Sequence, residues 1–115
     1  MDSDDESELI VLAPMGALDA YTAAEFRATV AGLPMRPARV VIDLTTVSFL
    51  DSAGLGALVG AIRRVRDTGG RVAVAAQRAP ARVLRTAGLA RLVTITDRLD
   101  DAHAALEKTD EADRA

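Results

Sequence analysis

The segments RVVIDL (39–44), SAGLGALVGAIRRVRD (52–67) and RVAVAA (71–76) decide the fold, because they follow one another as strand, helix and strand. The first is β-branched and apolar at successive positions, which is typical of a strand buried on both faces of a parallel sheet. The second carries apolar residues at helical spacing, and Gly69-Gly70 ends the predicted helix. Its apolar face consists of Leu55, Leu58, Val59, Ile62 and Val65. The unit predicts a βαβ crossover, with a loop at TTVSFLD (45–51).

Upstream of this unit, the sequence predicts one further strand and one helix. The apolar run LIVLA (9–13) suits a strand that lies at a sheet edge or ends at Pro14, because proline lacks a backbone donor. Thr22 and Glu25 then match a capping box, which predicts that a helix starts there. Gly32 marks its end. Its inward stripe is Ala23, Phe26, Val30 and Leu33.

Downstream, the alternation of helix and strand continues. Pro80 suits the first position of a third helix, and Gly88 suits its end. A strand is predicted at LVTIT (92–96), and a last helix from about Leu99 to Leu106. The third helix should turn Val83, Leu84 and Ala87 inward. This order predicts a single α/β domain with alternating helices and a mainly parallel sheet of four to five strands.

Composition excludes several classes of function. The 115 residues are enough for one domain, and the absence of Cys excludes disulfides, thiolate metal sites and cysteine nucleophiles. A single His argues against multi-His metal sites, and three aromatic residues without Trp argue against nucleic-acid binding by stacking. The longest apolar runs fall well short of the roughly 20 residues of a membrane span. The acidic start is unlike a signal peptide. We expect a cytoplasmic protein without metal, cofactor, membrane or direct nucleic-acid contact.

Charge divides the chain into three parts. Residues 1–8 contain five acids and no base, residues 9–106 contain eight acids and twelve bases, and residues 107–115 contain four acids and two bases. We expect residues 1–8 to be a disordered acidic tail, because they offer too little apolar surface to bury. Residues 9–106 should form the domain, and residues 107–115 a polar tail. The stretch from residue 52 to 98 has nine Arg and two Asp. Either solvated helix faces or an acidic partner would account for it.

The segment FLDSAGLGALVG (49–60) is where function is to be expected. Asp51 or Ser52 should cap the helix that follows, since both side chains accept from free N–H groups. Each glycine inside a helix costs about 1 kcal/mol relative to Ala. Close packing on the sheet, or approach of a partner or an anion to the helix start, would explain Gly54, Gly56 and Gly60. The glycine spacing fits neither a P-loop nor a dinucleotide fingerprint, and Leu50 stands where a nucleophile elbow needs Gly.

The string DSAGLG (51–56), preceded by VVIDLTTVSFL (40–50) and followed by an amphipathic helix, resembles the STAS domain of anti-anti-sigma factors, also called anti-sigma factor antagonists. GALD (16–19) is similar to that family's G-E-L-D turn after the first strand. PARVLRTAGLARLVTITD (80–97) is similar to its third helix and the strand that follows. The resemblance extends over about residues 9–106, and it implies a binding switch rather than an enzyme.

In that family, the unphosphorylated domain binds an anti-sigma factor, often a Ser/Thr kinase with the histidine-kinase-like ATPase fold, and the sigma factor is released. The kinase phosphorylates the serine after the motif Asp, and a PP2C-type phosphatase removes the phosphate. The resemblance implies that Ser52 is the phosphoacceptor. Ala17 replaces the Glu of G-E-L-D, which removes a possible contact for a basic partner. The implied partner-binding residues are Asp19, Asp51, Ser52, Ala53, Gly54 and Gly56.

Three alternatives stand beside this interpretation. The first is a STAS scaffold subunit of an ABC-type lipid transporter, which is never phosphorylated; those relatives tend to have Thr and extra Gly where this chain has Ser52-Ala53. The second is a small enzyme that uses Ser52 and Asp51, for which the chain offers no plausible base. The third is a nucleotide-binding regulatory STAS domain, which fold alone does not exclude.

Overall fold

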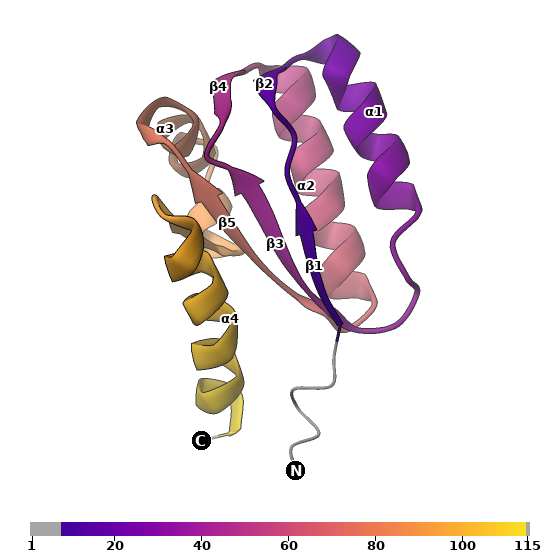
Figure 1. Cartoon of the computed structure of the whole chain (residues 1–115), viewed down its shortest axis with the longest axis vertical. Helices are drawn as coiled ribbons and strands as arrows, with labels where there is room; N and C mark the ends of the chain where they lie inside the picture. Colours follow the sequence, from indigo (N-terminus) through magenta and orange to yellow (C-terminus); the bar gives the residue numbers. More distant parts are fainter. Residues whose placement is uncertain (1–7, 115) are drawn as a thin grey trace.

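The computed structural model describes residues 8–114, with side chains described as far as Glu107. Four strands form a parallel sheet in the order β1-β3-β5-β6, and two more form a short parallel pair, β2-β4. Figure 1 shows helices on both faces of the larger sheet. The predicted α/β class is therefore confirmed. The elements are β1 (Glu8–Leu12), β2 (Gly16–Leu18), α1 (Ala20–Ala31), β3 (Ala38–Leu44), β4 (Val47–Leu50), α2 (Ser52–Asp67), β5 (Arg71–Ala76), α3 (Arg78–Thr86), the 3-10 helix η2 (Leu89–Arg91), β6 (Thr94–Thr96) and α4 (Leu99–Arg114).

The strand predicted to be buried on both faces is β3, which lies between β1 and β5. Val40 and Ile42 belong to the large core that α2 covers, whereas Val41 belongs to a smaller core on the other face. β1 is an edge strand and ends at Leu12, shortly before Pro14, as the missing donor of proline predicts. Because all pairings in this sheet are parallel, the carboxyl ends of its strands meet at one end of the molecule.

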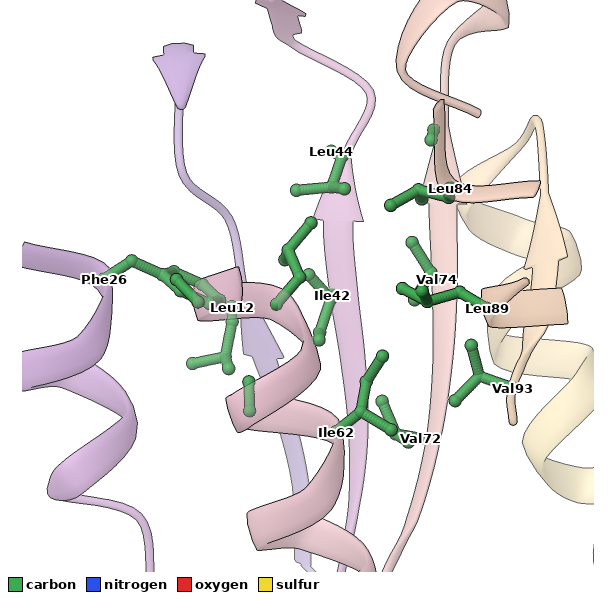
Figure 2. Packing of buried hydrophobic residues seen from close by; sticks show 14 of the residues in the cluster. Leu12, Phe26, Ile42, Leu44, Ile62, Val72, Val74, Leu84, Leu89 and Val93 are labelled. Atoms are coloured by element: carbon green, nitrogen blue, oxygen red, sulfur yellow. The ribbon is translucent and has the colours of Figure 1, made fainter. Parts of the chain in front are cut away.

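The large core joins three helices to one face of the sheet. In Figure 2, Phe26 of α1, Ile62 of α2 and Leu84 of α3 point toward side chains of β1, β3 and β5. The smaller core lies under α4, where the helix residues Ala102 and Leu106 pack on small residues of the sheet. These sheet residues are Val41, Ala73 and Ala75. Burial on both faces explains why β3 and β5 read as nearly continuous apolar runs.

The predicted loop at residues 45–51 is wrong in part, because Val47–Leu50 forms β4 and pairs with β2. β4 continues the direction of β3 after the turn at residues 45–46, and β2 follows β1 in the same way, so the small pair extends beyond the larger sheet (Figure 1). The Asp43 carboxylate accepts from the backbone N–H of Thr45 at 2.9 Å. Such a bond, from the side chain to the backbone two residues on, stabilises the turn that separates the two strands.

Two helix starts differ from the prediction. α1 begins at Ala20, and its N-cap is Asp19, with Thr22 as the third helical residue instead of the cap. In α3, Pro80 is the third residue instead of the first. Pro80 still lies within the first turn of α3, where a backbone N–H would have no acceptor inside the helix, so proline is tolerated there.

Other deviations lie toward the carboxyl end. Ala87, predicted to face inward, is exposed because α3 has already ended, and Ala81 is buried in its place. Leu92 and Val93, predicted to start the strand, form a turn and a bend directly after η2, so β6 begins only at Thr94. α4 continues past Leu106 to Arg114. The predicted acidic tail lies outside the described residues except for Glu8, the first residue of β1.

Candidate functional site

The carboxyl ends of β2 and β4 bring the two sequence motifs together. Leu18 and Leu50 are register partners at these ends, and the backbone N–H of Asp51 donates to the Leu18 carbonyl oxygen at 3.4 Å. Asp19 and Asp51 follow directly, and they cap α1 and α2, respectively. The N-termini of α1 and α2 therefore lie side by side, at the end of the molecule where β2 and β4 are labelled in Figure 1. We call the surface formed by Asp19, Asp51 and Ser52 the capped edge.

Asp19 is fixed by a reciprocal capping box. Its Oδ1 accepts from the backbone N–H groups of Tyr21 at 3.0 Å and Thr22 at 3.1 Å. The Asp19 N–H in turn donates to the Thr22 hydroxyl oxygen at 3.0 Å, and this hydroxyl donates to the Ala17 carbonyl oxygen at 2.7 Å. The hydrogen bonds donated to its carboxylate, chiefly that from the backbone N–H of Thr22, hold the pKa of Asp19 below its ordinary value. Asp19 therefore carries a negative charge of fixed position at neutral pH.

Asp51, and not Ser52, is the cap of α2. Its Oδ1 accepts from the backbone N–H of Gly54 at 3.0 Å. Ser52 is the first residue of this 16-residue helix, and it is exposed. The next residue, Ala53, is half-buried and packs against the large core. Because the Asp51 side chain caps α2, the exposed Ser52 is not needed for this role.

The glycines of α2 differ in their surroundings. Gly54 is buried, and a Cβ there would overlap the Leu18 carbonyl oxygen and lie 2.9 Å from Leu50 Cδ1. By contrast, Gly56 is exposed, and its nearest neighbour to such a Cβ would be Arg27 Nη2 at 3.5 Å. A Cβ at Gly60 would meet nothing within 4 Å. Close packing therefore explains Gly54 only, and Gly54 positions the helix start without itself being exposed.

Exposed apolar side chains near the capped edge were not predicted. Tyr21 is 82% exposed and Phe49 is 55% exposed, although both are aromatic. They stand two residues after Asp19 and two residues before Asp51. The sequence did contain a signal, because two of its only three aromatic residues flank the two capping acids. Aromatic side chains are enriched at protein interfaces, so their exposure here favours a protein partner.

The capped edge offers an exposed serine, two carboxylates engaged as caps and the N-termini of two helices. Within residues 8–107 there is no group of three or more His, Cys, Asp or Glu side chains that could hold a metal ion. A phosphate on Ser52 would be stabilised by the positive end of the α2 dipole. It would also add negative charge directly beside Asp51. The geometry therefore suits a surface whose charge changes without a change of fold.

Comparison with known proteins finds similar sequences and similar folds. The sequence profile of the STAS domain matches residues 2–102. Over 53 residues the chain is 42% identical to an anti-sigma-B factor antagonist of Listeria monocytogenes, which covers 45% of this chain and 46% of the relative. The aligned stretch thus spans about half the length of this curated relative.

Two solved structures cover most of the chain. A crystal structure of an anti-sigma factor antagonist from Mycobacterium paratuberculosis is 29% identical, with a TM-score of 0.69 over 85% of this chain and 86% of that one. The STAS domain of a SulP transporter from Vibrio cholerae is 25% identical, with a TM-score of 0.73 over 91% and 85% of the two chains. Across residues 8–114, the helices are too short or too polar to cross a membrane. The profile match over most of the chain, together with these shared folds, shows that the chain belongs to the STAS domain family.

Proposed function

We propose that this chain is an anti-sigma factor antagonist. In this proposal, the capped edge binds an anti-sigma factor with Ser/Thr kinase activity in the cytoplasm, and sigma-factor-dependent transcription follows. Phosphorylation of Ser52 ends the binding, and a PP2C-type phosphatase restores it. The domain acts as a binding module and not as an enzyme. The names of the relatives in Listeria monocytogenes and Mycobacterium paratuberculosis support the antagonist role.

One observation carries the proposal: the Ser52 hydroxyl is exposed at the first position of α2, next to the capping carboxylate of Asp51. The neighbouring strand end adds Asp19. A kinase can reach this hydroxyl without unfolding the chain. A partner that covers it must also cover two carboxylates, so the partner surface should be basic or rich in hydrogen-bond donors.

The effect of the phosphate follows from charge and hydration. A phosphoserine adds about −1.5 to −2 charges at pH 7 and strong acceptor oxygens. The fold should tolerate this charge because the helix dipole favours it at this position. An interface built around an unmodified Ser52 must instead remove water from the phosphate beside Asp51 and Asp19. An unpaired charge costs several kcal/mol on burial, and each 1.4 kcal/mol is a tenfold change in affinity.

The binding experiment compares Ser52→Asp with Ala28→Asp, which adds the same charge at an exposed position of α1. Calorimetric titration is carried out against the anti-sigma factor of the same host. We expect Ser52→Asp to remain folded and to lose at least tenfold in affinity, and Ala28→Asp to bind like the unmodified chain. Undiminished affinity of Ser52→Asp would contradict the proposal, as would an equal loss in both variants.

The acceptor is tested separately with Ser52→Ala. This variant should bind the anti-sigma factor and should gain no mass when it is incubated with the kinase and ATP, whereas the unmodified chain should gain one phosphate. Intact-mass spectrometry measures both. A phosphate on Ser52→Ala would assign the acceptor elsewhere, with the exposed Ser48 and Thr46 as the nearest hydroxyls in the sequence.

The likeness to the STAS domain of a SulP transporter keeps a scaffold role in a transport protein, such as an ABC-type lipid transporter, as the second candidate. A scaffold domain would have no need of a phosphoacceptor at the capped edge. Copurification of the tagged chain from its host separates the two candidates, since it should recover either an anti-sigma factor or a permease with its ATPase. Loss of the recovered complex when the tagged chain carries Ser52→Asp would favour the antagonist role.

A further inference from the structure

A groove lined by arginines lies where the last two strands of the sheet begin. β6 is the last strand in the order β1-β3-β5-β6, so within residues 8–114 its outer edge pairs with no strand. The groove has a volume of about 790 Å³ and is lined by Arg71, the first residue of β5, and Thr94, the first residue of β6. It therefore lies at the amino ends of the parallel strands. Its charged lining residues are Arg66, Arg71, Arg85 and Arg91, and among residues 8–107 neither Asp nor Glu lines it.

Arg66 and Arg85 donate to backbone carbonyl oxygens and not to carboxylates. Arg66 Nη1 donates to the Leu92 carbonyl oxygen at 2.6 Å, and Arg85 Nη2 donates to the Ile95 carbonyl oxygen at 3.3 Å. Within residues 8–107, Arg66, Arg85 and Arg91 form no ion pair. All three are exposed. Because each guanidinium has five N–H donors, the groove retains donors in a geometry that suits carboxylates.

The chain itself carries a segment of matching charge. Residues 1–7 contain four acids and no base. They are joined to Glu8, the first residue of β1, at the same end of the sheet as the groove. β1 and β6 are three strand spacings apart, or about 14 Å. Seven extended residues span up to about 23 Å, so the segment is long enough to reach the groove.

We infer that residues 1–7 dock in this arginine-lined groove of the same molecule, with their carboxylates bound to Arg66, Arg85 and Arg91. Docking of this kind relies on charge and not on apolar burial, because the segment is almost entirely polar. It should weaken as salt shortens the Debye length from about 8 Å at physiological ionic strength to about 3 Å at 1 M. The capped edge lies at the opposite end of the sheet, so the docked segment leaves Ser52 uncovered. The inference does not depend on the proposed function.

A spin label tests the contact directly, because the chain has no Cys and Ser3→Cys therefore accepts a single nitroxide. In the isotope-labelled full chain, we expect the amide signals of Leu92 and Val93 to broaden strongly and that of Asp51 to remain sharp. High salt should remove the broadening. Replacement of the four acids, Asp2, Asp4 and Asp5 by Asn and Glu6 by Gln, should remove it as well, with unchanged dispersion of the remaining spectrum.

Matched variants separate the groove from general attraction. The pair Arg66→Gln and Arg91→Gln should abolish the broadening. The pair Arg78→Gln and Arg82→Gln, which removes equal charge from the exposed face of α3 outside the groove, should preserve it. Broadening that is absent, or that both pairs reduce equally, would overturn the inference. Broadening that appears only between a spin-labelled molecule and a separate isotope-labelled molecule would place a second copy in the groove and would also overturn it.

Discussion

The substitution Gly54→Ala tests whether α2 is seated on β2 as tightly as the structure shows. The added Cβ would overlap the Leu18 carbonyl oxygen and lie 3.0 Å from the Leu18 carbonyl carbon, and both are backbone atoms that cannot rotate away. The start of α2 or the end of β2 must therefore shift. Forcing a methyl group into a packed site typically costs about 1–3 kcal/mol. This cancels or outweighs the gain in helix propensity of roughly 1 kcal/mol that Gly→Ala brings on its own.

The matched control is Gly60→Ala, in the same helix, where a Cβ would meet nothing within 4 Å. We expect Gly54→Ala to lower the free energy of unfolding by up to about 2 kcal/mol, which is the packing cost less the propensity gain, and Gly60→Ala to raise it by about 1 kcal/mol. Since both variants gain the propensity term, they differ by the packing cost of about 1–3 kcal/mol, and with roughly 4 °C per kcal/mol for a domain of this size they should melt about 4–12 °C apart. Thermal unfolding followed by circular dichroism measures the difference. Equal melting temperatures of the two variants would refute the account of Gly54.

Three further outcomes are expected at the capped edge. Asp51→Ala should lower the free energy of unfolding by about 0.5–2 kcal/mol through loss of the α2 cap, whereas Ser52→Ala should leave it nearly unchanged in urea unfolding. Because hydrogen bonds lower the pKa of Asp19, its stabilisation should be complete above the ordinary Asp pKa of about 3.9 and disappear as the pH falls through the lowered pKa. The free energies of unfolding of Asp19→Asn and of the unmodified chain should accordingly differ at neutral pH and converge in acid. Gly56→Gln should raise the melting temperature slightly through helix propensity and weaken binding to the anti-sigma factor at least tenfold by calorimetry, because its side chain would stand between the exposed surface of α2 and the partner.

The bounds of α2 could be predicted because its signals are local. A capping acid precedes Ser52 and two glycines follow the last turn, so the predicted helix over residues 52–67 is confirmed. The strands β2 and β4 could not be predicted in the same way. They have three and four residues, and each is defined by its pairing with a segment about 30 residues away. No local alternation of polar and apolar residues marks such a short pair.

The start of α1 shows a different difficulty. Asp19 with Thr22 and Thr22 with Glu25 are both acceptable capping boxes in the sequence, and the structure uses the first. The choice is made by β2, which ends at Leu18 and leaves the chain to turn at the next residue. In α2, Gly54, Gly56 and Gly60 have equal helix propensity, and only the approach of Leu18 distinguishes the first of them. The assignment of Ser52 as phosphoacceptor remains a prediction.

The direction of the strands has a practical consequence for experiments on this domain. β1 starts, and α4 ends, at the end of the molecule opposite the capped edge (Figure 1). A reporter fusion, an affinity tag or a link to a sensor surface at either end of the chain would thus be attached on the far side from Ser52. Immobilised in this way, the molecules present Asp19, Asp51 and Ser52 outward in a common orientation, and a captured partner meets no obstruction from the support.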